Sequence, residues 1–225
     1  MKIESIQTNN VQIGDTSIQN FSSMLTGNYI INGNFNVWQR GASFSSSGYT
    51  ADRWDGGNID TASAQASTIT SLPNITVMQF GSNTTSHATL TQSIESFDVL
   101  DLPGNKVTIS FWARAVTGCT SNTFQARLLY PDSQDDWAST NTIESFNIWD
   151  GGIADTNWRY YTFTSTAVMP SEVSRGLRLM FYTTNDTVNH TMEIAQVKLE
   201  KGEMATPFIG RPMAQELLLC QRTGL

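Results

Sequence analysis

An alternation of apolar and polar residues is the feature that most restricts the fold of this 225-residue chain. Between residues 107 and 115 every second residue is apolar, and the positions between are filled by Thr108, Ser110, Trp112 and Arg114. Successive side chains of a strand point to opposite faces, so this pattern predicts a strand that is buried on one face only. No segment of useful length with helical spacing interrupts the strand-like runs. We therefore expect an all-β protein.

Similar runs recur along most of the chain, separated by segments rich in Gly, Pro, Asn and Asp. They cover residues 75–80, 87–95, 124–130, 144–149, 158–168, 176–184 and 192–199, and a further strand is expected around 29–38. Strands at this spacing are typical of an antiparallel β-sandwich. Within 176–184 both alternating sets carry large side chains, so we expect that strand to be covered on both faces.

The chain is acidic, with 13 basic residues against 20 acidic ones and a net charge of −7. Such a charge repels phosphate backbones and anionic lipid, so we expect no nucleic-acid partner and no membrane insertion. No apolar run is long enough for a signal peptide or a membrane span, which predicts a protein made in a cytoplasm and not secreted. Cys119 and Cys220 lie far apart without metal-ligand spacing, so free thiols are expected.

Two segments stand outside the predicted sandwich, which we place at residues 29–210. Residues 1–28 hold too few apolar residues for a core of their own, and 211–225 predict a short helix with Pro212 in its first turn. Their apolar side chains need another surface, so we expect the helix to pack on the sandwich or on a neighbouring subunit, and both segments to support a homo-oligomer, expected to be a trimer. The residues expected in these assembly contacts are Ile3, Ile6, Val11, Ile13, Ile18, Phe21, Leu217 and Leu218.

Four ordered blocks of sequence resemble a known family. They read YIINGNFNVWQRG at 29–41, YTADRW at 49–54, VTISFWAR at 107–114, and QVKLEKG at 196–202 followed by ATPF at 205–208 and LCQR at 219–222. This set resembles the jelly-roll domain of bacteriophage tail fibres and other virion surface proteins. The resemblance implies a jelly-roll sandwich, a place on the virion, and other phage virion proteins as partners.

The same domain is distantly similar to the carbohydrate-binding modules attached to xylanases and laminarinases. In those modules acidic residues of the opening and closing segments help to hold a structural calcium ion. Here Asn36, Ala195 and Gln196 stand at the corresponding positions, and they lack the anionic oxygen ligands that calcium prefers. We therefore expect no metal site and no cofactor.

Aromatic side chains on an exposed sheet face suit sugar binding, because the apolar face of a pyranose ring stacks on a flat aromatic ring. Trp112 alternates out of phase with Phe111, and Tyr160 with Tyr161, so one of each pair faces away from the other layer. The glycan-binding candidates are Trp112, Tyr160 and Trp54. The alternative for each ring is burial in the core or in a subunit contact.

Known catalytic patterns are absent from the sequence, which has no Gly-x-Ser-x-Gly, no phosphate-binding loop and no His-Glu-x-x-His. Glu95 and Glu193 could act as a glycosidase couple, but any acidic sandwich offers such pairs. We therefore expect no enzyme and no catalytic residue. The expected function is that of a virion surface structural protein of the tail-fibre type that binds a host-surface polysaccharide. Two alternatives stay open: a capsid decoration protein that stabilises the phage shell, and an accessory domain of a carbohydrate-active enzyme.

Overall fold

The computed structural model describes residues 11–13, 16–18, 27–83, 87–117, 124–149, 155–183 and 190–221. At the N-terminal end, strands β1 (Val11–Ile13) and β2 (Thr16–Ile18) pair in antiparallel register. The expected assembly residues Ile3, Ile6 and Phe21 lie outside the described residues, as do the side chains of Val11, Ile13 and Ile18. Cys119 lies outside them as well.

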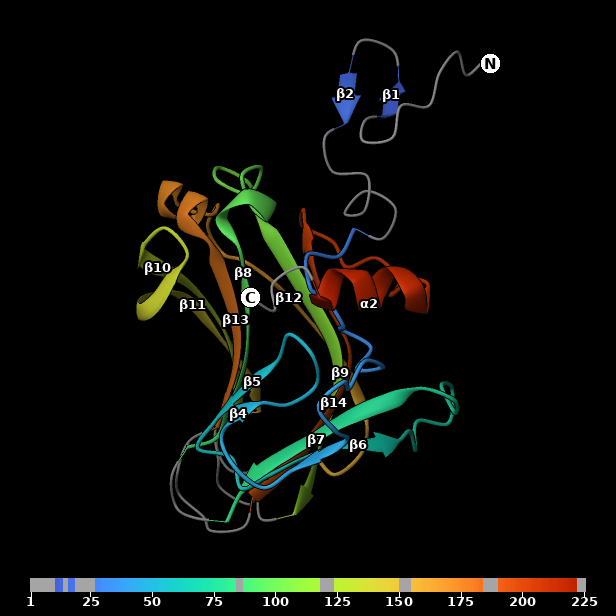
Figure 1. Cartoon of the computed structure of the whole chain (residues 1–225). Helices are drawn as coiled ribbons and strands as arrows, with labels where there is room; N and C mark the ends of the chain where they lie inside the picture. Colours follow the sequence, from blue (N-terminus) through green and yellow to red (C-terminus); the bar gives the residue numbers. More distant parts are fainter. Residues whose placement is uncertain are drawn as a thin grey trace.

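Two six-stranded antiparallel sheets form a sandwich (Figure 1). The first, called the β13 sheet, contains in spatial order β11 (Asp136–Trp149), β10 (Phe124–Ser133), β13 (Leu177–Thr183), β8 (Thr89–Ile94), β5 (Asp55–Gly57) and β4 (Gly48–Tyr49). The second, called the β14 sheet, contains β12 (Arg159–Thr164), β9 (Val107–Thr117), β14 (His190–Lys201), β7 (Thr76–Ser82), β6 (Thr61–Ala66) and β3 (Ser43–Phe44). This arrangement confirms the predicted all-β jelly-roll sandwich.

Three short helical segments complete the described fold. They are η1 (Ser96–Asp98), η2 (Ser171–Arg175) and the C-terminal helix α2 (Met213–Gln221). The prediction of a short C-terminal helix is confirmed, with a start two residues later than the expected 211. Within the described parts of the chain, no helix has the length and apolar character needed to cross a membrane.

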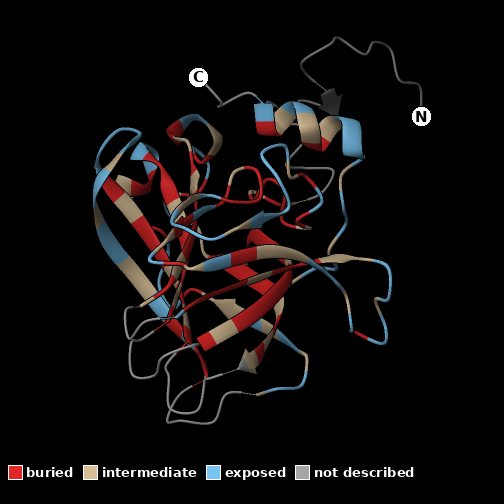
Figure 2. Cartoon of the chain, turned by 60° about the horizontal axis from the view of Figure 1, so that its bottom comes forward, coloured by how far each residue is buried: buried red, intermediate tan, exposed pale blue. Residues whose placement is uncertain are grey.

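The core lies between the two sheets, and Figure 2 shows that buried residues occur along many of their strands. Phe111 on β9 meets Phe181 on β13 edge to face, with ring centroids 4.9 Å apart. Phe124 on β10 stacks on Phe181 at 5.9 Å. Each sheet therefore contributes every second residue to the core, as the period-2 pattern predicts.

Strand β13 is not buried on both faces, contrary to the prediction for 176–184. Leu177, Leu179 and Phe181 are fully buried in the core. The alternate residues, Arg178 and Tyr182 among them, are only half-buried on the outer face of the β13 sheet. Large side chains occupy this face because they lie against side chains of neighbouring strands, so their size does not indicate a second buried layer.

The strand predicted around 29–38 is also wrong, since this segment is irregular in the structure. Asn32 and Phe35 have φ angles of 54° and 53°, a left-handed conformation that a strand cannot contain. The segment instead lies close against β14, where the Val197 N–H donates to the Gly33 carbonyl at 2.8 Å. A Cβ atom on Gly33 would lie 2.2 Å from the Val197 oxygen, so only glycine fits this approach.

Several strands were not predicted because they are short or carry few typical strand residues. Strands β3, β4 and β5 have two or three residues each, too few for a periodic pattern, and β6 reads TASAQA. Strand β11 begins at Asp136 and not near 144, because the chain folds back at once after β10 and pairs Ser133 with Asp136. The turn between them contains Asp135 at φ 55°.

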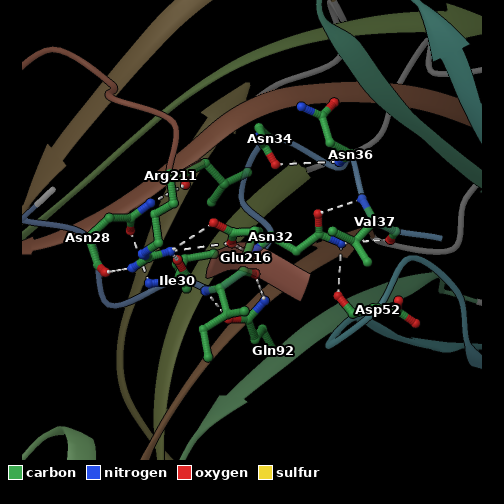
Figure 3. Close-up of polar contacts among 12 residues, drawn as sticks. Asn28, Ile30, Asn32, Asn34, Asn36, Val37, Asp52, Gln92, Arg211 and Glu216 are labelled. Carbon is green, nitrogen blue, oxygen red and sulfur yellow. Dashed lines mark hydrogen bonds and ion pairs between the residues drawn. The ribbon is translucent and has the colours of Figure 1, made fainter. Parts of the chain in front are cut away.

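A buried polar network joins the segment after residue 27 to helix α2 (Figure 3). Its members, called the anchor network, are Asn28, Asn32, Gln92, Arg211 and Glu216. The Arg211 guanidinium lies 3.3 Å from the Glu216 carboxylate, and both side chains are almost fully buried. Arg211 also donates to the carbonyls of Ile30 and Asn28, and the Asn32 backbone N–H donates to Glu216. These contacts hold α2 against the sandwich of its own chain.

Helix α2 covers the sandwich with one side only, as Figure 2 shows. Leu217 is half-buried and packs with Cys220 against Ile31 and Val37. Leu218 is 67% exposed. The structure thus separates the two leucines that were expected to act together in assembly.

Candidate functional site

An open pocket of about 630 Å³ lies on the outer face of the β14 sheet. The sheet contributes Trp112 and Arg114 of β9, which point away from the core that holds Phe111. The segment between β6 and β7 and the segment before β12 form the other walls. The residues that line it, called the aromatic pocket, are Thr68, Ile69, Thr70, Ser71, Trp112, Arg114, Thr156, Asn157 and Trp158.

Trp112 and Tyr160 lie side by side on this outer face. The register of β9 and β12 pairs them directly, and their ring centroids are 5.5 Å apart at an angle of 51°. Tyr160 is 42% exposed and stands beside the pocket, whereas Trp112 is half-buried over a small outer cluster formed with Ile69 and Val77. Both candidates therefore have ring surface outside the core, and their role toward a sugar stays a prediction.

Trp158 is a second aromatic wall that sequence analysis did not single out. Its indole N–H donates to the Thr68 hydroxyl at 2.8 Å. The Arg114 guanidinium lies 5.2 Å from the centre of its ring, a cation–π distance. Thr68 is 90 residues away along the chain, so no local pattern could have indicated this contact.

The charged groups near the pocket neutralise each other. The Nε of Arg114 lies 2.7 Å from the Glu193 carboxylate, and the Gln79 amide donates to the other Glu193 oxygen at 3.0 Å. Glu193 is therefore held in a buried ion pair. Glu95 pairs instead with Arg53 at 2.8 Å, at the end of a strand in the other sheet. The two carboxylates belong to separate ion pairs, and the structure does not bring them together as a glycosidase couple.

The segment before β12 is held by Asp155. Its carboxylate accepts the Asn157 backbone N–H at 2.8 Å and pairs with Arg159, while its carbonyl accepts the Ala115 N–H. The hydrogen bond from Asn157, together with Arg159, holds the pKa of Asp155 below its usual range. This wall of the pocket is thus ordered before any ligand arrives.

Trp54 is not a surface residue, and the prediction that it binds a glycan is wrong. Its side chain has no exposed area, and its ring centroid lies 5.2 Å from that of Phe35 and 6.2 Å from that of Phe181. The indole N–H donates to the Asn32 carbonyl at 3.1 Å. Trp54 enters the core because it directly precedes β5 and packs against Phe181 of the same sheet and against Phe35.

The sequence matches no protein-family model and no curated protein. Solved structures do match. A Stig cyclase from Fischerella sp. TAU has a TM-score of 0.50 and 11% identity, covering 76% of this chain and 96% of that one. A family 22 carbohydrate binding module from Clostridium thermocellum has a TM-score of 0.48 and 16% identity over 72% and 98% of the two chains. A domain solved with β-1,4-galactotriose has a TM-score of 0.44 and 12% identity over 77% and 98%. The feature shared at such low identity is the fold.

Proposed function

We propose that this chain is a non-catalytic glycan-binding protein and that the aromatic pocket is its sugar site. The observation that carries the proposal is an open, preformed pocket with Trp112 and Trp158 in its walls and Tyr160 at its margin. An aromatic face suits the C–H face of a pyranose ring. The hydroxyl and amide groups of Thr70, Ser71 and Asn157 are suited to the sugar hydroxyls.

Binding at one pocket is expected to be weak. A sugar ring offers a modest stacking area, and its hydroxyls exchange water for protein hydrogen bonds at little net gain. Several copies of the pocket in one oligomer would raise the apparent affinity, because the second and third contacts become intramolecular.

Replacing Trp112 with alanine is expected to weaken glycan binding about tenfold to thirtyfold. The loss arises because a sugar would no longer have the aromatic face of Trp112 in the wall of the pocket. A glycan array of bacterial and plant polysaccharides identifies a binding oligosaccharide, and calorimetry then gives its Kd for both proteins. Phe97→Ala is the matched control, since Phe97 is an aromatic residue on η1 that is 69% exposed. Equal affinities of Trp112→Ala and wild-type protein would remove the pocket from consideration.

We propose that the protein lies on the surface of a phage virion, because its four sequence blocks resemble the jelly-roll domain of virion surface proteins. Two roles there remain, a tail-fibre module and a capsid decoration protein, of which we favour the fibre. Immunogold labelling of intact particles tests both. Label on fibres supports our choice, label over the capsid supports decoration, and the absence of label on any particle contradicts the virion role.

The protein is also proposed to be a homotrimer, with α2 taking part in the contact between chains. The exposed Met213 and Leu218 of this helix support the proposal. Light scattering is expected to give three times the chain mass of 24.9 kDa. Leu218→Glu is expected to shift the protein toward the monomer without a change in circular dichroism, whereas Phe97→Glu leaves the mass unchanged. A monomeric wild-type protein would contradict this proposal.

A further inference from the structure

Two arginine side chains on the outer face of the β13 sheet, Arg127 and Arg178, form no ion pair with any carboxylate among the described residues. Most other described arginines do pair with an acid, namely Arg40, Arg53, Arg114, Arg159 and Arg211. In a chain with a net charge of −7, carboxylates are plentiful, so two unpaired cations on one face are unexpected. We propose that these two arginines bind the carboxylate groups of an acidic saccharide.

The two arginines are close neighbours on this face. In the β10–β13 register, Arg127 pairs with Met180 and Leu129 pairs with Arg178. Arg127 and Arg178 are therefore diagonal neighbours, a relation with about 7–8 Å between Cα atoms. Arg127 lies over Tyr182, and Arg178 donates to Ser93. The two guanidinium groups are therefore directed to different sides, and each can hold one carboxylate of a chain of acidic sugar units.

Each guanidinium is oriented by neutral groups. The Cζ of Arg127 lies 3.6 Å from the centre of the Tyr182 ring, and its Nε donates to the Gln125 amide oxygen at 2.8 Å. The Cζ of Arg178 lies 4.8 Å from the centre of the Trp137 ring, and its Nε donates to the Ser93 hydroxyl at 2.9 Å.

The terminal nitrogens of both arginines remain available. Nothing among the described residues accepts a hydrogen bond from the η nitrogens of Arg127 or Arg178. A guanidinium whose flat face and Nε are occupied still presents two parallel N–H groups, which is the geometry that a carboxylate matches. The surroundings of the two arginines thus orient them without using their strongest donors.

The carboxylate of Asp55 on β5 acts on Arg178, but it does not cancel the positive charge of the two arginines. Asp55 acts on Arg178 only through space, without an ion-pair contact between the two side chains. Burial raises the pKa of the Asp55 carboxyl, and the charge of Arg178 opposes that rise. Two cations against one carboxylate leave a local positive charge in a protein that is negative as a whole.

The ligand expected here differs in chemistry from that of the aromatic pocket. The Tyr182 ring is already in contact with Arg127 and is stacked with His87 at 5.1 Å, so it offers little area for sugar stacking. Recognition by charge is therefore favoured over recognition by stacking. Gln125 of β10 and Ser93 of β8 are neutral polar residues beside the two arginines, to which their side chains are hydrogen-bonded.

The test uses a tetrasaccharide of galacturonic acid and the same tetrasaccharide as its methyl ester, which has no charge. Calorimetry is expected to show binding of the acid and at least about tenfold weaker binding of the ester. Binding of the acid should weaken as salt rises, because exposed charges are screened. The comparison of acid and ester needs no variant, so it holds even if a substitution harms folding.

Arg127→Gln with Arg178→Gln is expected to weaken binding of the acid at least about a hundredfold, as two charged contacts are lost. Replacement of both by lysine keeps the charge but not the paired donors, so it should restore part of the affinity. Lys106→Gln with Lys201→Gln is the matched control, since it removes two positive charges near the end of the β14 sheet. This control should bind like the wild-type protein.

Equal affinity for acid and ester would overturn the inference, and so would unchanged affinity in the double glutamine variant. Competition by inorganic phosphate that is as strong as that by the tetrasaccharide would also overturn it, because it would indicate an anion site without saccharide recognition. Trp112→Ala should still bind the acid. Failure of the aromatic pocket and failure of this site are therefore distinguishable.

Discussion

Trp54→Ala is expected to lower the free energy of unfolding by about 3–5 kcal/mol. The side chain is fully buried, so its removal leaves a cavity next to Phe35 and Phe181 in the middle of the core. The replacement also leaves the Asn32 carbonyl without the indole N–H that it accepts, and a buried acceptor without a partner adds to the cost.

Thermal unfolding followed by circular dichroism measures this effect. For a chain of this size, a loss of about 3–5 kcal/mol corresponds to a decrease in Tm of about 6–20 °C. The matched control is Tyr49→Ala on β4, because Tyr49 is an aromatic residue that is 60% exposed. A Trp54→Ala protein with the Tm of this control would contradict the placement of Trp54 in the core.

Arg211→Ala is expected to destabilise the protein by a similar amount, about 3–5 kcal/mol. The substitution leaves the Glu216 carboxylate buried without its cation, and the carbonyls of Ile30 and Asn28 lose a donor. A double replacement, Arg211→Met with Glu216→Leu, removes both charges. It should recover part of the loss, because a buried charge without a partner costs more than an apolar pair.

The reactivity of the Cys220 thiol shows whether the loss of stability in Arg211→Ala is confined to helix α2. Burial is the main reason that the pKa of its thiol is raised to about 12, so at pH 8 it holds very little of the reactive thiolate. If Arg211→Ala frees the helix, the pKa falls toward its usual range and alkylation of Cys220 by iodoacetamide becomes faster. Peptide mapping by mass spectrometry separates this reaction from that of Cys119. Slow alkylation in a fully folded Arg211→Ala protein would mean that the anchor network is not needed to hold the helix.

Local sequence patterns were enough to predict the strands that have a long period-2 pattern, and the C-terminal helix. In β9 the alternation of Phe111 and Trp112 is a local property, because it follows from the geometry of any strand. The same reasoning placed Trp112 and Tyr160 on an outer face, where the structure has them. It failed for the segment 29–38, whose conformation depends on contacts with β14, and for Trp54, which is buried by Phe181 and Phe35 from distant parts of the chain.

The contacts between side chains that are distant in the sequence depend on how the strands pair and pack. Trp158 becomes part of a pocket because the segment between β6 and β7 places the Thr68 hydroxyl where it accepts the Trp158 indole N–H. Arg127 and Arg178 become neighbours through the register of β10 and β13, which are far apart in the sequence. Alternation along one strand tells which face a residue occupies, whereas the residue opposite it depends on the pairing of the strands, and that pairing is set by packing of the whole core.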